Sequence, residues 1–184
     1  TASCESAANK EIVVIALHPP VIMETLERIK DTVAEETQVI SFAPKISIEK
    51  IASKLATKNI GRMIPNATSY INEGYNPVSF SEEYSSGEKQ SLLEVLKTMG
   101  NTFEVEESKL EAYAMVSAML PTYFWFQWKQ MQALGLQMGL NETESAETVR
   151  ETLLAAIDLL YASGLNYDEV VDLIPVKPIG EHEE

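Results

Sequence analysis

Three short segments combine polar side chains with proline at points where a strand-like run of residues ends. They are residues 17–20 (Leu-His-Pro-Pro), 42–45 (Phe-Ala-Pro-Lys) and 62–67 (Arg-Met-Ile-Pro-Asn-Ala). Open α/β sheets bind ligands at the carboxyl ends of their strands, so ligand contacts are expected in these segments. The third segment is the most informative, because the Arg62 guanidinium and the Asn66 amide could orient a cofactor and a small acid. Without further context, a surface ion pair for Arg62 and a turn position for Asn66 are the ordinary alternatives.

Several other kinds of site have little support in the sequence. The eight glycines form neither a Gly-x-Gly-x-x-Gly pattern nor a P-loop between a strand and a helix. The two histidines, His18 and His182, are far apart and belong to no metal-binding motif. Glu104, Glu106 and Glu107 are more typical of a solvated charged edge than of an acid/base pair. We therefore expect no metal ion.

The composition argues against nucleic-acid and membrane partners. Asp and Glu together number 28 against 14 Lys and Arg, and the formal net charge is −14, whereas phosphate contacts need clustered Lys and Arg. The longest nearly apolar run, residues 112–126, contains polar residues and is shorter than the roughly 20 residues that span a bilayer. The single cysteine, Cys4, excludes an internal disulfide and is compatible with the cytoplasmic location that we expect.

The first hundred residues alternate between strand and helix patterns. Strands are predicted at 12–17, 38–42, 59–64, 76–80 and 101–105, and helices at 3–8, 21–36, 47–55 and 87–99. Strand–helix–strand units of these lengths give right-handed crossovers and a mostly parallel, partial Rossmann-type sheet. Only helical patterns follow, so we predict an α/β plus all-α protein with domains at 1–106 and 107–184.

The first predicted strand, residues 12–17, is apolar at every position. Such a run predicts a strand that is buried on both faces in the middle of a sheet. Within this sequence, residues 38–42 are its one obvious neighbour, so its other edge would be unpaired and prone to aggregation. We therefore expect two or three further strand–helix units before residue 1. The alternative is that a partner chain or a swapped strand covers this edge.

The helical half is organised around residues 108–139, the longest segment with helical apolar periodicity. Pro121 lies in its middle and predicts a break near residues 118–121. Aromatic residues point nearly all round the part after the break, and too little chain follows to cover them. They are Tyr123, Phe124, Trp125, Phe126 and Trp128. We favour a homodimer that interlocks through residues 108–139 and 143–163; an ordinary monomeric core helix is the alternative.

Four segments, in this order, resemble the pyrroline-5-carboxylate reductase family. They are IVVIALHPP (12–20), VISFAPKISIEKI (39–51), GRMIPNATSYINEG (61–74) and the long segment from 95 to 140. The most specific is Arg62-Met63-Ile64-Pro65-Asn66, which is similar to the family's Arg-x-Met-Pro-Asn. Pro121-Thr122-Tyr123 resembles its Pro-Ala-Tyr, and the resemblance runs from about residue 8 to about residue 172.

The resemblance implies a fold, an activity and candidate site residues. Residues 1–106 would be the C-terminal portion of a Rossmann-type NAD(P)-binding domain, and 107–184 a helical dimerisation and substrate domain. The implied activity is NAD(P)H-dependent hydride transfer to a cyclic imine or a related small substrate, in proline biosynthesis. No catalytic side chain is assigned. The implied cofactor-binding residues are Ala16, Leu17, His18, Pro19, Ala43 and Asn66, and the implied substrate-binding residues are Ser117, Leu120 and Pro121.

This sequence departs from the family pattern at several of these positions. His18 stands where the family has Lys, Pro44-Lys45 replaces an Ala-Gly pair, and residues 116–120 replace a Ser-Gly-Ser-Gly kink. Residues 173–180 stand where the family has a Ser-Pro-Gly-Gly-Thr-Thr loop, and the family's glycine-rich fingerprint would precede residue 1. These residues alone are therefore expected to be inactive. The alternative function is a non-catalytic dimerising or regulatory protein on the same fold.

Overall fold

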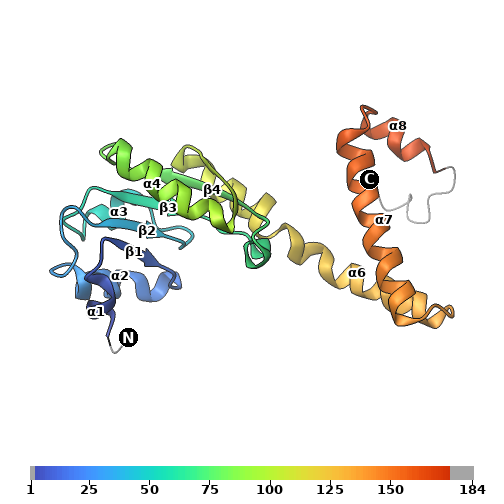
Figure 1. The fold of residues 1–184 in the computed structure, drawn as a ribbon, viewed down its shortest axis with the longest axis horizontal. Helices are drawn as coiled ribbons and strands as arrows, with labels where there is room; N and C mark the ends of the chain where they lie inside the picture. The colour runs from blue at the N-terminus through green and yellow to red at the C-terminus, as the bar shows by residue number, and fades with distance from the viewer. Residues whose placement is uncertain (1–2, 175–184) are drawn as a thin grey trace. The chain divides into compact units, whose positions relative to one another are not determined.

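The computed structural model describes residues 3–174 of the chain (Figure 1). Contacts between residues divide the chain into two compact units, one ending at Tyr123 and the other beginning at Phe124. Residues 175–180, which stand where the family's Thr-Thr loop is expected, lie outside the described residues, as does His182. The two units are described separately.

The first unit contains a five-stranded sheet in which each strand lies beside the next one along the chain. The strands are β1 (Ile12–Ile15), β2 (Gln38–Ser41), β3 (Ile60–Met63), β4 (Gly74–Phe80) and β5 (Gly100–Glu104). β1, β2 and β3 pair in parallel, β4 runs antiparallel to β3, and β5 is parallel to β4. The predicted, mostly parallel α/β sheet is confirmed, whereas the reversal at β4 was not predicted.

Up to β5, the described α-helices agree with the predicted ones in number and order. They are α1 (Cys4–Ala8), α2 (Pro19–Ile29), α3 (Ile48–Ala52) and α4 (Ser86–Leu96), with short 3-10 helices η1 (Ala67–Ile71), η2 (Lys97–Met99) and η3 (Glu107–Lys109). Ser47 caps α3, because its side chain accepts a hydrogen bond from the Lys50 amide. α2 ends earlier than the predicted residue 36. Val33 still reaches the core from the following turn, which explains why the apolar pattern continues beyond the helix.

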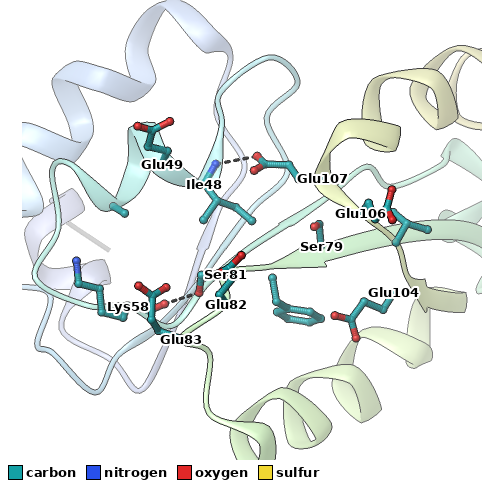
Figure 2. A pocket seen from close by; sticks show the side chains of 13 residues that line it. Ile48, Glu49, Lys58, Ser79, Ser81, Glu82, Glu83, Glu104, Glu106 and Glu107 are labelled. Carbon is teal, nitrogen blue, oxygen red and sulfur yellow. Dashed lines mark hydrogen bonds between the residues drawn. The ribbon is translucent and has the colours of Figure 1, made fainter.

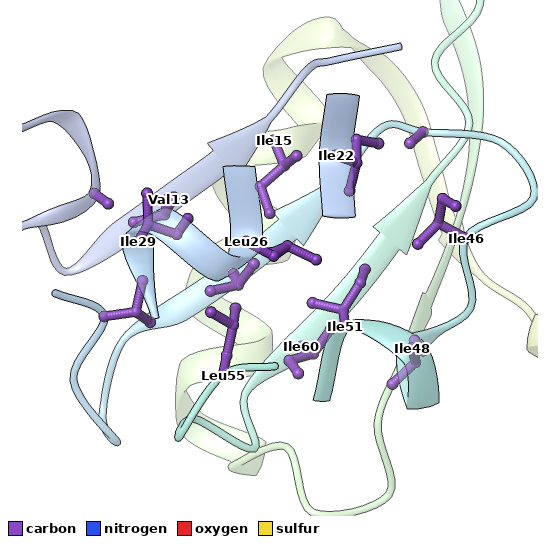
Figure 3. Packing of buried hydrophobic residues seen from close by; sticks show 14 residues of the cluster. Val13, Ile15, Ile22, Leu26, Ile29, Ile46, Ile48, Ile51, Leu55 and Ile60 are labelled. Carbon is purple, nitrogen blue, oxygen red and sulfur yellow. The ribbon is translucent and has the colours of Figure 1, made fainter. Parts of the chain in front are cut away.

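Two apolar clusters cover the two faces of the sheet. The cluster drawn in Figure 3 joins β1, β2 and β3 to α2 and α3, with Leu26 and Ile51 fully buried. The other joins the sheet to α4 through Leu92 and Leu96. Val39 belongs to the first cluster and Ile40 to the second, because successive strand residues point to opposite faces.

β1 lies at one end of the sheet and is buried on one face only. Val13 and Ile15 are buried among the residues of the first cluster, but Ile12 and Val14 are 38% and 50% exposed. The expectation that this strand is buried on both faces is wrong for the described residues. The physical reason is that α2 covers one face of β1 and no described helix covers the other.

The outer edge of β1 carries unpaired backbone groups, as the sequence predicts. The carbonyls of Glu11 and Ile15 accept hydrogen bonds from Gln38 and Phe42, so they face β2. Backbone groups alternate in direction along a strand, so those of Ile12 and Val14 point toward the free edge, where no described strand lies.

The described chain after β5 is helical. α5 (Leu110–Tyr113) continues as a π-helical turn, η4 (Ala114–Ala118), and is followed by α6 (Leu120–Gln137), α7 (Glu142–Ala162) and α8 (Tyr167–Asp172). The predicted break is confirmed, because Met119 interrupts the helix and Pro121 is the second residue of α6. Proline is tolerated in the first turn of a helix, where its missing N–H would have no acceptor within that helix.

The first unit ends at residue 123, whereas the predicted first domain ends at residue 106. The observed division therefore lies about 17 residues further along the chain. Leu110 is fully buried, and Tyr113 contacts the ring of Phe103 on β5 at a centroid distance of 5.6 Å. The first helical residues therefore pack on the sheet, although their sequence pattern belongs with the helices that follow.

The second unit leaves most of its apolar side chains exposed. Among its described residues only Ser145 is buried, and its hydroxyl donates to the Gln132 carbonyl at 2.7 Å. Phe126 and Ile157 are 68% and 50% exposed. This exposure is what the sequence predicts for helices that need further cover, and the homodimer stays a prediction. None of the described helices is long and apolar enough to cross a membrane.

Candidate functional site

The three segments predicted to bind ligands come from one edge of the sheet. β1, β2 and β3 are parallel neighbours, so the chain leaves all three strands at the same edge. Ala16, Leu17 and His18 are exposed there, Pro19 is half-buried, and Ala43 is buried. The structure therefore gathers the predicted cofactor-binding segments, while their role stays a prediction.

Asn66 joins the predicted cofactor residues to the predicted substrate residues. Its Nδ2 donates to the Ser117 carbonyl at 3.0 Å and lies 3.3 Å from the Ser117 hydroxyl. Its Oδ1 accepts from the Thr68 amide at 2.8 Å and from the Thr68 hydroxyl at 2.9 Å. The side-chain amide thus uses both of its donor hydrogens and its acceptor within the protein.

Pro121 explains why the Ser117 carbonyl needs a side-chain donor. In an α-helix the carbonyl of residue 117 would accept from the N–H of residue 121, and proline has none. Asn66 supplies the missing donor. The Ser117 hydroxyl in turn donates to the Tyr75 carbonyl at 2.9 Å, which ties η4 to β4. Ser117 is buried and its polar groups are engaged, whereas Leu120 is exposed and Pro121 is half-buried.

Arg62 is a buried arginine that pairs with two partly exposed carboxylates. Its side chain is 4% exposed, its Nη1 donates to Glu107 Oε1 at 2.7 Å, and its Nη2 donates to Glu111 Oε1 at 2.9 Å. A guanidinium that already pairs with two carboxylates is not available to orient a substrate acid. Of the two interpretations drawn from the sequence, the ion pair is the one observed, although its arginine is buried and only its carboxylates reach the surface.

The same two carboxylates fix the segment after β2. Glu111 Oε1 accepts from the Lys45 amide at 2.9 Å, and Glu107 Oε1 accepts from the Ile48 amide at 2.8 Å. Lys45 has φ of 65°, a left-handed conformation that suits the glycine of the family pattern better than a lysine. Burial acts to raise the pKa of Glu111, but the Lys45 amide and Arg62 outweigh it and lower that pKa. The ionised carboxylate therefore helps to hold this strained segment.

Glu107 and Glu111 were not predicted as partners of Arg62. The expected charged edge is confirmed for Glu104 and Glu106, which pair with nearby lysines. Glu107 differs because it reaches the buried arginine. The sequence signal that could have indicated this pairing is the spacing of Glu107 and Glu111. Residues four apart share one face of a helix, so both carboxylates can reach the same arginine.

A groove of about 800 Å³ opens elsewhere on the first unit, between α3, β4 and the chain after β5 (Figure 2). Its lining includes six carboxylates and one ammonium group. They are Glu49, Glu82, Glu83, Glu104, Glu106, Glu107 and Lys58. Three of these carboxylates pair with Lys89, Lys109 and Arg62, but the charges still leave the lining net negative, which disfavours a dinucleotide or an acidic substrate.

The carboxyl edge fits one end of a dinucleotide cofactor and not the other. Exposed Ala16 and Leu17 offer apolar contacts for a nicotinamide ring. A pyrophosphate instead needs free backbone N–H groups at a helix start. α2 begins with Pro19 and Pro20, which have none, and the N–H groups of Lys45 and Ile48, near the start of α3, already donate to carboxylates. Residues 3–174 therefore contain no phosphate cradle at these two helices, and no cluster of side chains in this range could hold a metal ion.

Comparison with known proteins identifies relatives of the chain. No protein-family model matches the sequence. The chain is 24% identical over 145 residues to a pyrroline-5-carboxylate reductase of Staphylococcus saprophyticus, covering 78% of this chain and 54% of that protein. This chain is a divergent relative of the pyrroline-5-carboxylate reductases. The match to the Staphylococcus aureus reductase is 23% over 140 residues, and covers 76% of this chain and 52% of that protein. The resemblance seen in the sequence is confirmed, although the chain spans about half the length of these curated relatives.

Solved structures of reductases share the fold. The pyrroline carboxylate reductase of Plasmodium falciparum, solved with NADP bound, has a TM-score of 0.84 at 22% identity, and the match covers 98% of this chain and 69% of that one. The reductase of Coxiella burnetii has a TM-score of 0.74 at 23% identity, over 98% of this chain and 68% of that one. These likenesses confirm the predicted Rossmann-like sheet followed by a helical region.

Proposed function

We propose that this chain forms part of an NAD(P)H-dependent reductase that reduces a cyclic imine related to pyrroline-5-carboxylate, which would yield proline or a similar product. The observation that carries the proposal is the sequence relationship to reductases of that name over 78% of the chain. The meeting of the predicted segments at one edge of the sheet supports it.

The cofactor would supply the hydride, which passes from the nicotinamide to the imine carbon. Ala16, Leu17 and Pro19 would form an apolar wall for the nicotinamide end and exclude water from it. Ala43 would lie beside them, and His18 would take the place of the family's lysine. The phosphates would be held outside residues 3–174, because Pro19 and Pro20 at the start of α2 have no N–H and the amides of Lys45 and Ile48 near the start of α3 already donate to carboxylates.

The substrate end would be formed by Ser117, Leu120 and Pro121. Asn66 lies against Ser117, so the two predicted sets of residues are in contact. The helices at 108–139 and 143–163 would pair with those of a second copy of the chain, which the exposed apolar side chains of α6 and α7 favour. A cytoplasmic location remains part of this proposal, based on the single cysteine.

A non-catalytic dimerising or regulatory protein on the same fold is the second candidate. It is favoured by the hydrogen bonds that three residues of the site form within the protein. These residues are Arg62, Asn66 and Ser117. A protein that retains the fold without turnover would need those contacts for stability only.

Titration of the whole protein with NADPH and NADH, followed by assay with pyrroline-5-carboxylate, tests the proposal. We expect micromolar binding and consumption of the reduced cofactor. Ala16→Trp should abolish binding by filling the nicotinamide end, while the matched control Ala34→Trp, on an exposed turn before β2, should not. Binding without turnover would favour the second candidate, and the absence of binding would contradict the proposal.

A further inference from the structure

We propose that Asn66 is a positioning residue that fixes the π-helical turn η4 at the carboxyl edge of the sheet, and that it acts on the substrate end through Ser117. The sequence alone suggested direct contact between Asn66 and the cofactor. The consequence for turnover rests on the proposed function, whereas the consequence for η4 does not.

The first step is that Asn66 is itself held in place. Its backbone N–H donates to Asn76 Oδ1 at 2.9 Å. Asn76 is fully buried on β4, and its Nδ2 donates to the Met99 carbonyl at 3.3 Å. Asn66 also caps η1 through its two hydrogen bonds from Thr68. The direction in which its Nδ2 points is therefore set by β4 and η1, before any contact with the helical segment.

η4 contains a carbonyl, that of Ser117, which needs the hydrogen-bond donor that Asn66 provides. The Met119 amide donates to the Ala114 carbonyl at 3.0 Å, five residues back, which gives this turn its π-helical width. The Ser117 carbonyl has no donor from the helix, because Pro121 lacks an N–H and the Thr122 amide donates to the Met119 carbonyl at 3.0 Å; Ser117 is also buried. A buried carbonyl without a partner is unfavourable, so the hydrogen bond from the Asn66 amide stabilises η4 in this position.

The third step concerns the substrate end. Leu120 and Pro121 follow η4 directly, so their position depends on how this turn is fixed. Asn66, at the start of η1, and Tyr75, on β4, anchor Ser117. A change at Asn66 should therefore move the substrate residues and leave the cofactor segments after β1 and β2 in place.

Asn66→Asp separates this role from cofactor binding. The variant keeps the side-chain shape and the Oδ1 acceptor for Thr68, but an acceptor replaces the donor that faces the Ser117 carbonyl. We expect hydrogen exchange of the Met119 amide to accelerate at least tenfold without any ligand, and KM for the imine to rise about tenfold. The Kd for NADPH should change less than twofold. Asn101→Asp, an exposed site on β5, is the matched control and should change none of these.

A second substitution tests the reason for the contact. Pro121→Ala restores a backbone N–H four residues after Ser117, so the double variant Asn66→Asp/Pro121→Ala should recover part of the Met119 protection. If Asn66→Asp does not fold, Ser117→Ala, which removes the tie to Tyr75, should accelerate the same amide. Unchanged Met119 exchange in the folded variants, or a weaker NADPH affinity with unchanged KM, would overturn the proposal. A wild-type protein that reduces no imine would contradict the proposed function alone, because the exchange measurement needs no turnover.

Discussion

The sheet unit and the helical unit bury their apolar residues to very different extents. The sheet unit encloses two clusters, one on each face, and also buries polar groups such as Arg62 and Asn76 with hydrogen-bond partners. The helical unit buries only Ser145 among its described residues. A sheet can be covered by helices of the same chain, whereas two long helices that are apolar on several sides cannot cover each other. The first unit therefore contains its own core, whereas the described helices of the second leave most of their apolar side chains exposed.

The largest expected effect is loss of stability from the core of the sheet unit. Leu26→Ala removes a fully buried side chain and should lower the free energy of unfolding by about 2–5 kcal/mol. Leu154→Ala, at a residue of α7 that is 47% exposed, is the matched control for the isolated chain. Urea unfolding monitored by circular dichroism would measure both. Equal losses would show that α7 is as well covered as the sheet.

A smaller effect is expected on association of the helical unit. Ile157→Asp places a charge on an exposed apolar position of α7 and should weaken a homodimer by about 2 kcal/mol, roughly thirtyfold in Kd. Analytical ultracentrifugation should show a shift toward the 20.4 kDa monomer. Glu147→Gln, an exposed change on the same helix, serves as the control. A wild-type chain that is monomeric at all concentrations would contradict the expectation that the second unit associates with another copy.

The smallest expected effect is a pH dependence within the sheet unit. The pKa of Glu111 is lowered in the folded protein, so the ionised carboxylate stabilises the fold above the ordinary value of 4.5. This contribution should be lost as the pH falls below 4.5 and through the lowered pKa. Glu111→Gln should flatten that part of the stability curve, measured by thermal unfolding between about pH 3 and pH 7. An unchanged curve would contradict the role assigned to this carboxylate.

Local signals in the sequence predicted the elements of the fold well. Pro121 marked the break between η4 and α6, and Ser47 marked the start of α3. These signals act over about four residues, through caps, missing N–H groups and helical periodicity. The prediction that β1 is buried on both faces was wrong for a related reason. An apolar run shows that a strand can be buried on both faces, but it does not show which helices are present to cover those faces.

The candidate site was predicted only in part. The sequence placed Ala16, Ala43 and Asn66 at the carboxyl edge of the sheet, and the parallel pairing of β1, β2 and β3 gathers their segments there. It did not show that Asn66 reaches Ser117, or that Arg62 is already paired with two carboxylates. Both contacts join residues more than 40 positions apart, beyond the range of any local pattern.

The sequence by itself determined the order of strands and helices, the break at Pro121 and the relationship to the reductases. Only the tertiary structure decided that β4 runs antiparallel to β3, and that Glu107 and Glu111 occupy the guanidinium of Arg62. The tertiary structure also decided that the Asn66 amide donates to the Ser117 carbonyl, for which Pro121 has no N–H. The physical reason is that a hydrogen bond lost locally can be replaced by any donor that the fold brings within reach, and which donor arrives depends on how distant strands and helices pack.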